Sequence, residues 1–338
     1  MIKGSNGGCL IIAEAGVNHN GRLDLALKLC DKAKEIGADV VKFQAWKTEK
    51  IITQNVDQAE YQTKNTGVNE SQFDMLKKLE LSYDDFRKIK KHCDDIGIIF
   101  SSTSDEEDSL DFLLELGIPF IKIGSGDIGN VPYLRYMGAK KMPIILSTGM
   151  CTMDDVRFSL NILKESGATD ITILHCTTNY PCPFEDVNLN AMLSLKKEFN
   201  TDVGFSDHTI GLEASLSAVA LGATVIEKHF TLDCNMDGPD HAASTPPDEF
   251  KKLITSIRNV EKLLGDGVKQ PTKAEKEISK VVLKRIVAKK PINKGEVFSN
   301  DNLTVKRNDL GAPALLWDSV IGKIATKNYD YDQGVDVD

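Results

Sequence analysis

Residues 203–233 read VGFSDHTIGLEASLSAVALGATVIEKHFTLD, and two apolar segments in this stretch each lead directly into a cluster of polar residues. These clusters contain His208 and His229. If the two segments are neighbouring parallel strands, the imidazoles lie one strand spacing apart, roughly 4.8 Å, and can share a metal ion. A single histidine at a strand end is more often a structural residue, so the prediction of a metal site depends on the rest of the sequence.

The same alternation of an apolar segment and an amphipathic run recurs along most of the chain. Eight such segments are present: LIIAEAG (10–16), VVKFQ (40–44), GIIFSST (97–103), FIKIGS (120–125), PIILST (143–148), ITILHC (171–176), VGFSDH (203–208) and TVIEKHF (224–230). Strands alternating with helices indicate a parallel sheet. Eight units match a (β/α)8 barrel, whereas an open doubly wound sheet usually has a glycine-rich loop after its first strand. The sequence therefore predicts an α/β protein with a TIM barrel over residues 1–265.

One interval of the predicted barrel is longer than the others. More than fifty residues separate VVKFQ (40–44) from IIFSST (98–103). This predicts an insertion over residues 45–97. Insertions at this end of a barrel strand lie over the active-site mouth, so the segment would either shape the substrate site or form a plain surface excursion.

The pattern changes after residue 265. Residues 266–282 are charged and poor in apolar side chains, which predicts a linker. Residues 283–338 contain short β-like pieces separated by KG and DLG turns, which predicts a small β-rich domain. A domain of this size has little core of its own, so we expect it to pack against the barrel or a partner subunit.

The composition of the 338-residue chain, with 41% hydrophobic residues, predicts a globular protein. A net charge of −9 argues against a nucleic-acid or anionic-membrane surface. No apolar run is long enough to span a membrane, and the N-terminus lacks a signal-peptide pattern, so we expect a cytoplasmic protein. The seven cysteines are scattered without a CxxC pair, which predicts reduced thiols.

Polar side chains stand at the ends of the predicted strands. They are Glu14, Lys42 with Gln44, Thr103, Lys122 with Ser125, Ser147, His175, Ser206 with His208, and Glu227 with His229. Three of the pairs are spaced by two residues, which puts both members on the same side of a strand. The C-terminal ends of barrel strands carry the catalytic groups of this architecture, and lysines buried there without an anion would be unfavourable. The ring of polar groups therefore indicates an enzyme.

These residue types suit an anionic substrate. Two lysines and four hydroxyls make a cradle for a phosphate and a carboxylate, because charged donors form short, strong hydrogen bonds. The cradle residues are Lys42, Lys122, Thr103, Ser125, Ser147 and Ser206.

The histidine pair suits an open metal site. Two histidines are too few for a closed structural zinc site, so an ion at His208 and His229 would keep positions for water and a substrate oxygen. That arrangement suits Lewis-acid activation of a carbonyl. Oxygen-rich coordination points to an exchangeable divalent ion, with imidazole favouring Mn²⁺ over Mg²⁺. His19 is either a loop ligand or, as we expect, a turn residue.

The motifs and their order resemble the bacterial sialic acid synthases over nearly the whole chain. The resemblance is carried by AEAGVNHNG (13–21), VVKFQ (40–44), AEYQTKNTG (59–67), KIGSGD (122–127), ILSTGM (145–150), HCTTNYPCPFEDVNL (175–189), VGFSDHTIG (203–211), VIEKHFTLD (225–233), GPDHAAS (238–244) and NKGEVFSNDNLTVKR (293–307). It implies an antifreeze-like (SAF) C-terminal domain. It also implies condensation of phosphoenolpyruvate with an N-acetylated aldose to N-acetylneuraminate, legionaminate or pseudaminate. The AEAGVNHNG motif is similar to the first two branches.

The resemblance assigns roles to residues. It implies metal binding by His208 and His229, and phosphoenolpyruvate binding by Lys42, Thr103, Lys122, Ser125, Ser147 and Ser206. It places Glu14, Gln44, Tyr180 and Asp240 around the sugar and its aldehyde. Arg307 resembles the arginine that the SAF domain of one subunit extends to the N-acetyl group in the other subunit's barrel, which implies a domain-swapped homodimer.

Four departures from the family pattern bear on these roles. SSTSDEED (101–108) replaces the usual STPF turn beside Thr103. Asp127 stands where relatives commonly have glutamate, and either Glu14 or Asp127 would handle protons. VKRNDLGAPA (305–314) replaces the glycine-rich turn after Arg307. Thr178 stands where some members have asparagine, and is a candidate phosphoenolpyruvate contact.

The sequence leaves the identity of the sugar open. The first expectation is an N-acetylneuraminate synthase using N-acetylmannosamine, and the alternative is a legionaminate synthase using 2,4-diacetamido-2,4,6-trideoxymannose. These sugars differ at C4 and C6, and we expect the discriminating contacts in residues 45–97 and around Tyr180. Two further alternatives are a synthase that uses a phosphorylated sugar such as arabinose 5-phosphate, which needs another basic site, and a non-catalytic carbohydrate-binding barrel.

Overall fold

The computed structural model describes residues 3–58 and 70–336. The AEYQTKNTG motif (59–67) lies outside these residues. The chain divides into two compact units, Met1–Gly265 and Asp266–Asp338. Among the described residues, no helix is both long and apolar enough to cross a membrane.

The first unit is a closed barrel of eight parallel strands in the order of the sequence, as predicted. The strands are β1 (Leu10–Gly16), β2 (Val40–Ala45), β3 (Ile99–Ser104), β4 (Ile121–Ile123), β5 (Ile144–Ser147), β6 (Ile171–Cys176), β7 (Val203–Asp207) and β8 (Val225–His229). The barrel closes where β1 pairs with β8, with Leu10 opposite Val225 and Glu14 opposite His229.

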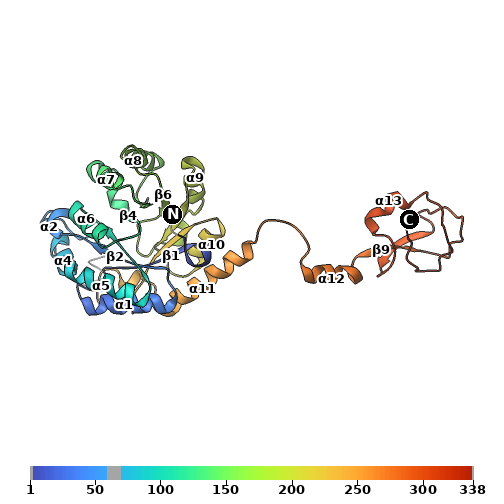
Figure 1. Cartoon of the computed structure of the whole chain (residues 1–338), viewed down its shortest axis with the longest axis horizontal. Helices are drawn as coiled ribbons and strands as arrows, with labels where there is room; N and C mark the ends of the chain where they lie inside the picture. The colour runs from blue at the N-terminus through green and yellow to red at the C-terminus, as the bar shows by residue number, and fades with distance from the viewer. Residues whose placement is uncertain (1–2, 59–69, 337–338) are drawn as a thin grey trace. The chain divides into compact units, whose positions relative to one another are not determined.

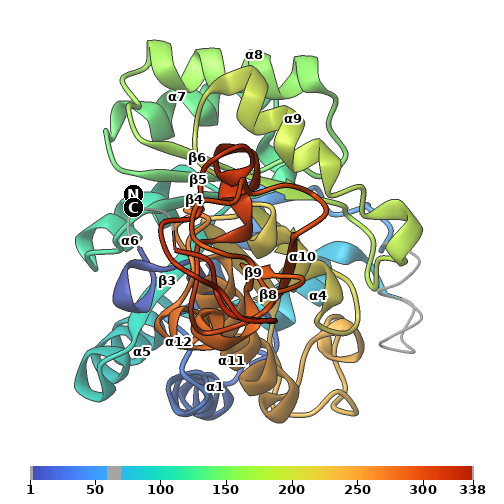
Figure 2. The same cartoon turned by 90° about the vertical axis from the view of Figure 1, so that its right-hand side faces the viewer.

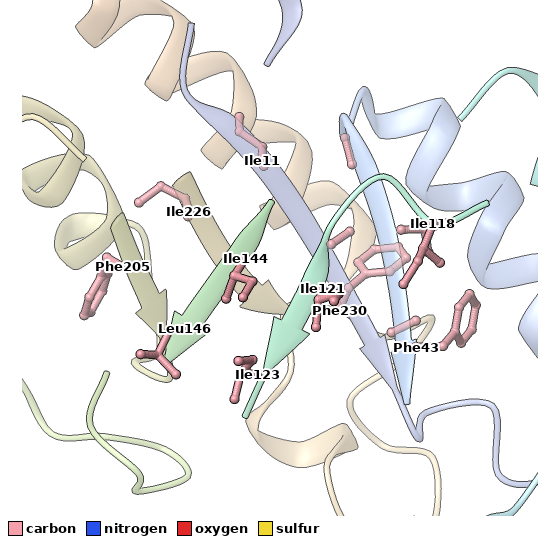
Figure 3. Packing of buried hydrophobic residues seen from close by; sticks show 14 of the residues in the cluster. Ile11, Phe43, Ile118, Ile121, Ile123, Ile144, Leu146, Phe205, Ile226 and Phe230 are labelled. Carbon is pink, nitrogen blue, oxygen red and sulfur yellow. The ribbon is translucent and has the colours of Figure 1, made fainter. Parts of the chain in front are cut away.

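Helices surround the barrel. They are α1 (Leu23–Ile36), α2 (Thr48–Ile51), α4 (Gln72–Leu79), α5 (Tyr83–Ile96), α6 (Glu107–Glu115), α7 (Val131–Ala139), α8 (Met153–Glu165), α9 (Asn190–Phe199), α10 (Glu213–Ala220) and α11 (Pro247–Leu264). Figures 1 and 2 show α7, α8 and α9 along one side of the barrel and α1, α5 and α11 along the other. Outward-facing strand residues pack beneath the helices, and Figure 3 shows Ile11, Ile144 and Ile226 in this layer.

The interior of the barrel changes character along the strands. Its lower layer is a separate apolar cluster of Leu10, Ile12, Val40, Phe120, Ile145, Leu174 and Val225. Because side chains alternate along a strand, the next inward position after Leu10 and Ile12 on β1 is Glu14, and on β8 Glu227 and His229 follow Val225. The apolar layer therefore forms the floor beneath a polar mouth.

The predicted insertion is shorter than residues 45–97. Helix α5 begins after Ser82, whose side chain accepts from the Asp85 N–H, and ends at Gly97, which has the left-handed φ of 72°. It buries Phe86, Ile89 and Cys93 and packs against β3 and α1. α5 is thus the ordinary connecting helix between β2 and β3, and the additional segment is residues 46–82, whose described parts, 46–58 and 70–82, contain α2 and α4.

The second unit has its own small core. Helix α12 (Lys273–Val282), inside the range predicted as linker, begins with a capping box between Thr272 and Glu275. Strand β9 (Lys284–Ala288) pairs antiparallel with β10 (Leu303–Arg307), and a short helix α13 (Trp317–Val320) follows. The buried cluster consists of Ile286, Ala288, Ile292, Phe298, Leu303, Ala312, Val320, Ala325, Tyr329 and Val335.

Candidate active site

A cavity of about 210 Å³ opens at the C-terminal ends of the barrel strands, above the apolar floor. Twelve of the predicted site residues line it: Glu14, Lys42, Gln44, Thr103, Lys122, Ser125, Ser147, Thr178, Tyr180, Ser206, His208 and His229. The structure thus gathers most of the predicted site around one space. Glu227, which the sequence predicts among the polar strand-end residues without a specific role, also lines the cavity. Asp105 and Cys176, to which the sequence alone assigns no role, line it as well.

Both lysines of the predicted cradle are buried and hold hydroxyl partners. The Lys42 ammonium donates to Thr103 Oγ1 at 2.9 Å and lies 2.6 Å from Glu14 Oε2. The Lys122 ammonium donates to Ser147 Oγ at 2.8 Å. With side chains 2% and 4% exposed, the two cations direct their donors into the cavity and not to solvent. The contact with Lys42 places Thr103 in the site despite the altered turn that follows it.

Glu227 lies between the two lysines. Its carboxylate oxygens are 3.7 Å from Lys42 Nζ and 3.5 Å from Lys122 Nζ, and Ser206 Oγ donates to it at 3.3 Å. Burial alone would raise the pKa of Glu227, but Lys122 and Lys42 outweigh it and lower the pKa to about 2. Glu227 is therefore the counter-charge of the cradle. The signal in the sequence was its spacing of two from His229.

Gly149 lies close to two hydroxyls that line the cavity. Gly149, just past β5, donates its N–H to Ser125 Oγ at 2.8 Å and so orients that hydroxyl. A Cβ at this position would lie 2.1 Å from Thr178 Oγ1 and 2.9 Å from Ser125 Oγ. A side chain at residue 149 would require these two cavity hydroxyls to move, which favours glycine at this position.

The two histidines meet at the junction of β7 and β8. Ser206 pairs with Glu227 in the strand register, and the ring centroids of His208 and His229, two residues farther along, are 5.6 Å apart. His208 Nδ1 is 2.7 Å from the Thr177 carbonyl oxygen, which can only accept, so Nδ1 carries the hydrogen and Nε2 keeps its lone pair. This carbonyl contact is the outer-shell support typical of a metal-binding histidine.

His229 also presents an acceptor. Burial, the neighbouring His208 and Lys42 together lower the pKa of His229 to about 3, so its ring is neutral at pH 7. Its Nδ1 lies 3.9 Å from an Asp240 carboxylate oxygen and has no hydrogen-bond partner. Burial lowers the pKa of His208, but hydrogen bonds to Cys176 and Thr177 raise it overall, so an ion at Nε2 would compete with a proton there. The pair fits a divalent ion; among the described residues, no three His, Cys, Asp or Glu side chains form a larger metal cluster.

The residues expected near the sugar lie beside the histidines. The Tyr180 ring is 4.1 Å from the His208 ring and 5.5 Å from the His229 ring, measured between centroids. Gln44 donates its amide to Glu14 Oε1 at 3.0 Å. Asp240 lines a second compartment that adjoins the first and shares Gln44, Tyr180 and His229 with it.

The candidate proton carriers differ in position. Glu14 faces the cavity, and burial raises its pKa against the opposing effect of Lys42. Asp127 ends the short 3-10 helix η2 (Ser125–Asp127), accepts from the Asn130 amide at 3.0 Å and is outside the cavity lining. Burial also raises the pKa of Asp127. Asp105, which does line the cavity, has its pKa raised to about 7 by burial and then by Asp127.

This shift predicts a pH-dependent stability. The unfolded carboxyl titrates near its ordinary value of 3.8 and the folded one near 7, so the folded state holds the proton in between and the free energy of unfolding falls as pH rises through this range. Asp105→Asn removes that loss and should stabilise the protein by ~1–3 kcal/mol at pH 8, with little effect at pH 4. Urea denaturation at both pH values measures it, with the exposed Glu115→Gln as control. An unchanged pH dependence in Asp105→Asn would contradict the assignment.

Three other residues singled out in the sequence lie elsewhere. His19 is buried in the turn after β1, where its Nδ1 accepts from the Gly21 N–H at 3.0 Å, which makes it a turn residue. His175 lies 2.6 Å from the Val187 carbonyl and lines a different pocket. Arg307 ends β10 in the second unit, with an exposed side chain.

Comparisons with known proteins identify the relatives of this chain. The model of the NeuB family matches residues 29–269, and that of the SAF domain matches residues 285–329. The chain is 51% identical to the N,N'-diacetyllegionaminic acid synthase of Campylobacter jejuni over 326 residues, 96% of this chain and 98% of the relative. The enzyme of the same name from Legionella pneumophila is 44% identical, with 96% and 93% covered. The crystal structure of N-acetylneuraminic acid synthetase from Leptospira borgpetersenii matches with a TM-score of 0.73 at 33% identity, covering 82% of this chain and 92% of that one.

Proposed function

The chain belongs to the NeuB family, and from this membership we propose that it condenses phosphoenolpyruvate with an N-acetylated aldose, releasing phosphate and a nine-carbon 2-keto sugar acid. The observation that carries the proposal is the juxtaposition of a buried two-lysine cradle and two histidine acceptors in one cavity. The relatives named N,N'-diacetyllegionaminic acid synthase favour 2,4-diacetamido-2,4,6-trideoxymannose as the sugar, the second of our two expectations. N-acetylmannosamine remains the other candidate.

The cradle suits phosphoenolpyruvate because the two lysines are buried and their positive charges are already neutralised by carboxylates. Lys42 and Lys122 are matched here by Glu14 and Glu227. An incoming phosphate and carboxylate would take over lysine donors from these carboxylates and add hydrogen bonds from Ser147, Thr103 and Ser206. The added negative charge would raise the pKa of Glu14 further and favour its protonated form.

His208 and His229 would hold the divalent ion, which we propose to be Mn²⁺ or Mg²⁺. The ring nitrogens of the two histidines, together with the oxygen-rich lining of the cavity, fit an ion that also takes water or substrate oxygen. When bound, the ion supplies Lewis-acid stabilisation of negative charge on an aldehyde oxygen.

The residues of this chain then orient the reactants and move protons. We propose that C3 of phosphoenolpyruvate forms a bond to the aldehyde carbon and that Glu14 gives its proton to the aldehyde oxygen. Water adds at the electron-poor C2 and loses a proton back to Glu14. The C–O bond to phosphate then breaks, the remaining proton of the C2 hydroxyl passes to the departing phosphate, and the ketone forms. Lys42 and Lys122 hold the anionic groups throughout. We assign the proton transfer to Glu14 and not to Asp127 because Glu14 lines the cavity.

We propose a cytoplasmic homodimer in which Arg307 of one subunit meets the N-acetyl group of the sugar in the other. Arg307→Ala should then raise the KM for the sugar by ~10–100-fold while leaving the KM for phosphoenolpyruvate nearly unchanged. The matched control is Lys306→Ala, one residue earlier on β10, where the lysine pairs with Asp332. Steady-state kinetics with each substrate varied makes the test, and an unchanged sugar KM would overturn the domain-swapped arrangement.

A phosphate-release assay with mass spectrometry tests the function. Phosphoenolpyruvate is supplied with each candidate sugar, with and without EDTA. The expected result is metal-dependent phosphate release and a product whose mass equals both substrates plus water minus phosphate. Absence of release with any N-acetylated aldose would favour the carbohydrate-binding alternative. Use of a phosphorylated sugar is disfavoured because, within the described part of the two adjoining compartments, Lys42 and Lys122 are the only lysine or arginine side chains.

A further inference from the structure

The compartment that adjoins the catalytic cavity is apolar on the side away from it. Its volume is about 220 Å³, and Val17, Met75, Leu76, Leu79 and Pro239 line it. The polar lining residues are Gln44, Tyr180, His229 and Asp240, and the first three are shared with the catalytic cavity. Apart from Asp240, the described side chains that line only this compartment are without hydrogen-bonding groups.

The residues of the apolar wall belong to a buried hydrophobic cluster. Val17, Trp46, Met75 and Leu79 form a buried cluster separate from the main core, with Ile51 and Leu76 packed against it. All except Val17 belong to the additional segment of residues 46–82. The described residues of this segment thus share a small hydrophobic core with Val17.

Helix α4, which carries three of the wall residues, is held at both ends. Ser71 caps its start by accepting from the Asp74 N–H at 3.1 Å. Glu80, just after its end, accepts from the Thr48 N–H at 3.0 Å and from Thr48 Oγ1 at 2.8 Å, and pairs with Lys47 and Lys77. The wall is therefore fixed in place before substrate arrives, which lowers the entropic cost of binding.

We propose that this compartment binds the end of the sugar distant from the aldehyde and selects a 6-deoxy sugar, whose terminal carbon is a methyl group. This inference rests on the proposed condensation, which puts the aldehyde beside His208 and His229. The rest of the sugar then extends past Tyr180 and Asp240 to the wall of Val17, Met75, Leu76 and Leu79. Against these four side chains a hydroxymethyl end would place its hydroxyl on an apolar surface, whereas a methyl end would be buried favourably.

The expected size of the selection follows from the chemistry of such pockets. One methyl or methylene in a hydrophobic pocket changes kcat/KM by about 10–200-fold. N-acetyl-6-deoxymannosamine and N-acetylmannosamine differ only at C6, and the wild-type protein should prefer the first by at least ~10-fold in kcat/KM. Adding a polar group to the wall should lower this preference.

Two variants test the wall from different elements. Leu76→Gln adds an amide from α4, and Val17→Thr adds a hydroxyl after β1 with almost no change in shape. Each should lower the preference ratio by ~10-fold, chiefly through kcat/KM for the deoxy sugar, with the KM for phosphoenolpyruvate unchanged. Leu76→Met should restore the ratio, because it is apolar and of similar volume. Lys78→Gln puts the same amide on the exposed face of α4 and should leave both sugars unaffected.

The outcomes separate the inference from the function on which it rests. If both sugars are converted and the ratio stays the same in Leu76→Gln and Val17→Thr, the wall does not select the sugar and the inference is wrong, while the condensation stands. If neither sugar yields phosphate with the wild-type protein, the proposed function is wrong and the assignment of this compartment is overturned with it. Should Leu76→Gln fail to fold by circular dichroism, the near-isosteric Val17→Thr decides.

Discussion

Replacing His229 with alanine is expected to lower kcat by more than ~10³-fold, because a catalytic metal ion contributes several kcal/mol to transition-state stabilisation. His208→Ala should have an effect of the same order, since the two rings lie 5.6 Å apart and would share the ion. Each variant should also lose Mn²⁺ binding, measured by electron paramagnetic resonance as the fraction of free Mn²⁺. The pairing of a kinetic and a binding readout separates loss of the ion from a general loss of structure.

His92 provides the control for this pair. It lies on α5, at the outside of the barrel, where its ring contacts Asp31 at 2.7 Å. His92→Gln should bind Mn²⁺ and turn over substrate as the wild type does. The metal assignment fails if His229→Ala retains Mn²⁺ binding at wild-type affinity, or if His92→Gln loses it.

The second large effect is expected for Lys122→Met. It removes one of the two cations beside Glu227, whose carboxylate is buried and keeps only Lys42 at 3.7 Å. Removing one partner from a buried ion pair is expected to lower the free energy of unfolding by ~3–5 kcal/mol. The loss of a charged donor to phosphoenolpyruvate should in addition lower kcat/KM for this substrate by ~10³-fold. Urea denaturation and steady-state kinetics on the folded fraction measure the two effects.

The barrel offers a matched control on another strand, β8. Lys228 is also buried, pairs with Asp207 at 2.9 Å and donates to the Thr209 carbonyl at 2.6 Å, but it points away from the cavity. Lys228→Met should cost a similar amount of stability and leave kcat/KM for phosphoenolpyruvate of the folded protein unchanged. Equal kinetic losses in the two variants would show that Lys122 acts through stability alone.

The sequence predicted the barrel and most of the cavity for one physical reason. Side chains on a strand alternate, so Ser206 with His208 and Glu227 with His229 had to face the same way, and parallel strands bring their C-terminal ends to one place. Where a residue belonged to this alternation, as Lys42 and Lys122 do, its place in the cavity followed from the sequence.

The errors and omissions lie in the loops, where no such rule applies. Four acids follow one another at 105–108, and the sequence does not show that Glu106 turns back to cap α6 while Asp105 faces the cavity. Asp127 is held by Asn130 outside the lining, a contact set by the local 3-10 turn. The sequence predicts a single insertion over residues 45–97, which is too long because the short helix α4 precedes α5 and hides the ordinary connection. The apolar wall depends on packing between Val17 and α4, which are far apart in the chain.

The fate of the bridging oxygen of phosphoenolpyruvate tests the proposed reaction most directly. Phosphoenolpyruvate is labelled with ¹⁸O at the oxygen between C2 and phosphorus and is incubated with Mn²⁺, the N-acetylated sugar and the protein. The mass of the released phosphate is then measured by mass spectrometry. If water adds at C2 while the cradle holds the phosphate, the C–O bond breaks and every released phosphate carries the label. Unlabelled phosphate would show that the P–O bond breaks instead, and would contradict the role given to Lys42, Lys122 and the histidine pair.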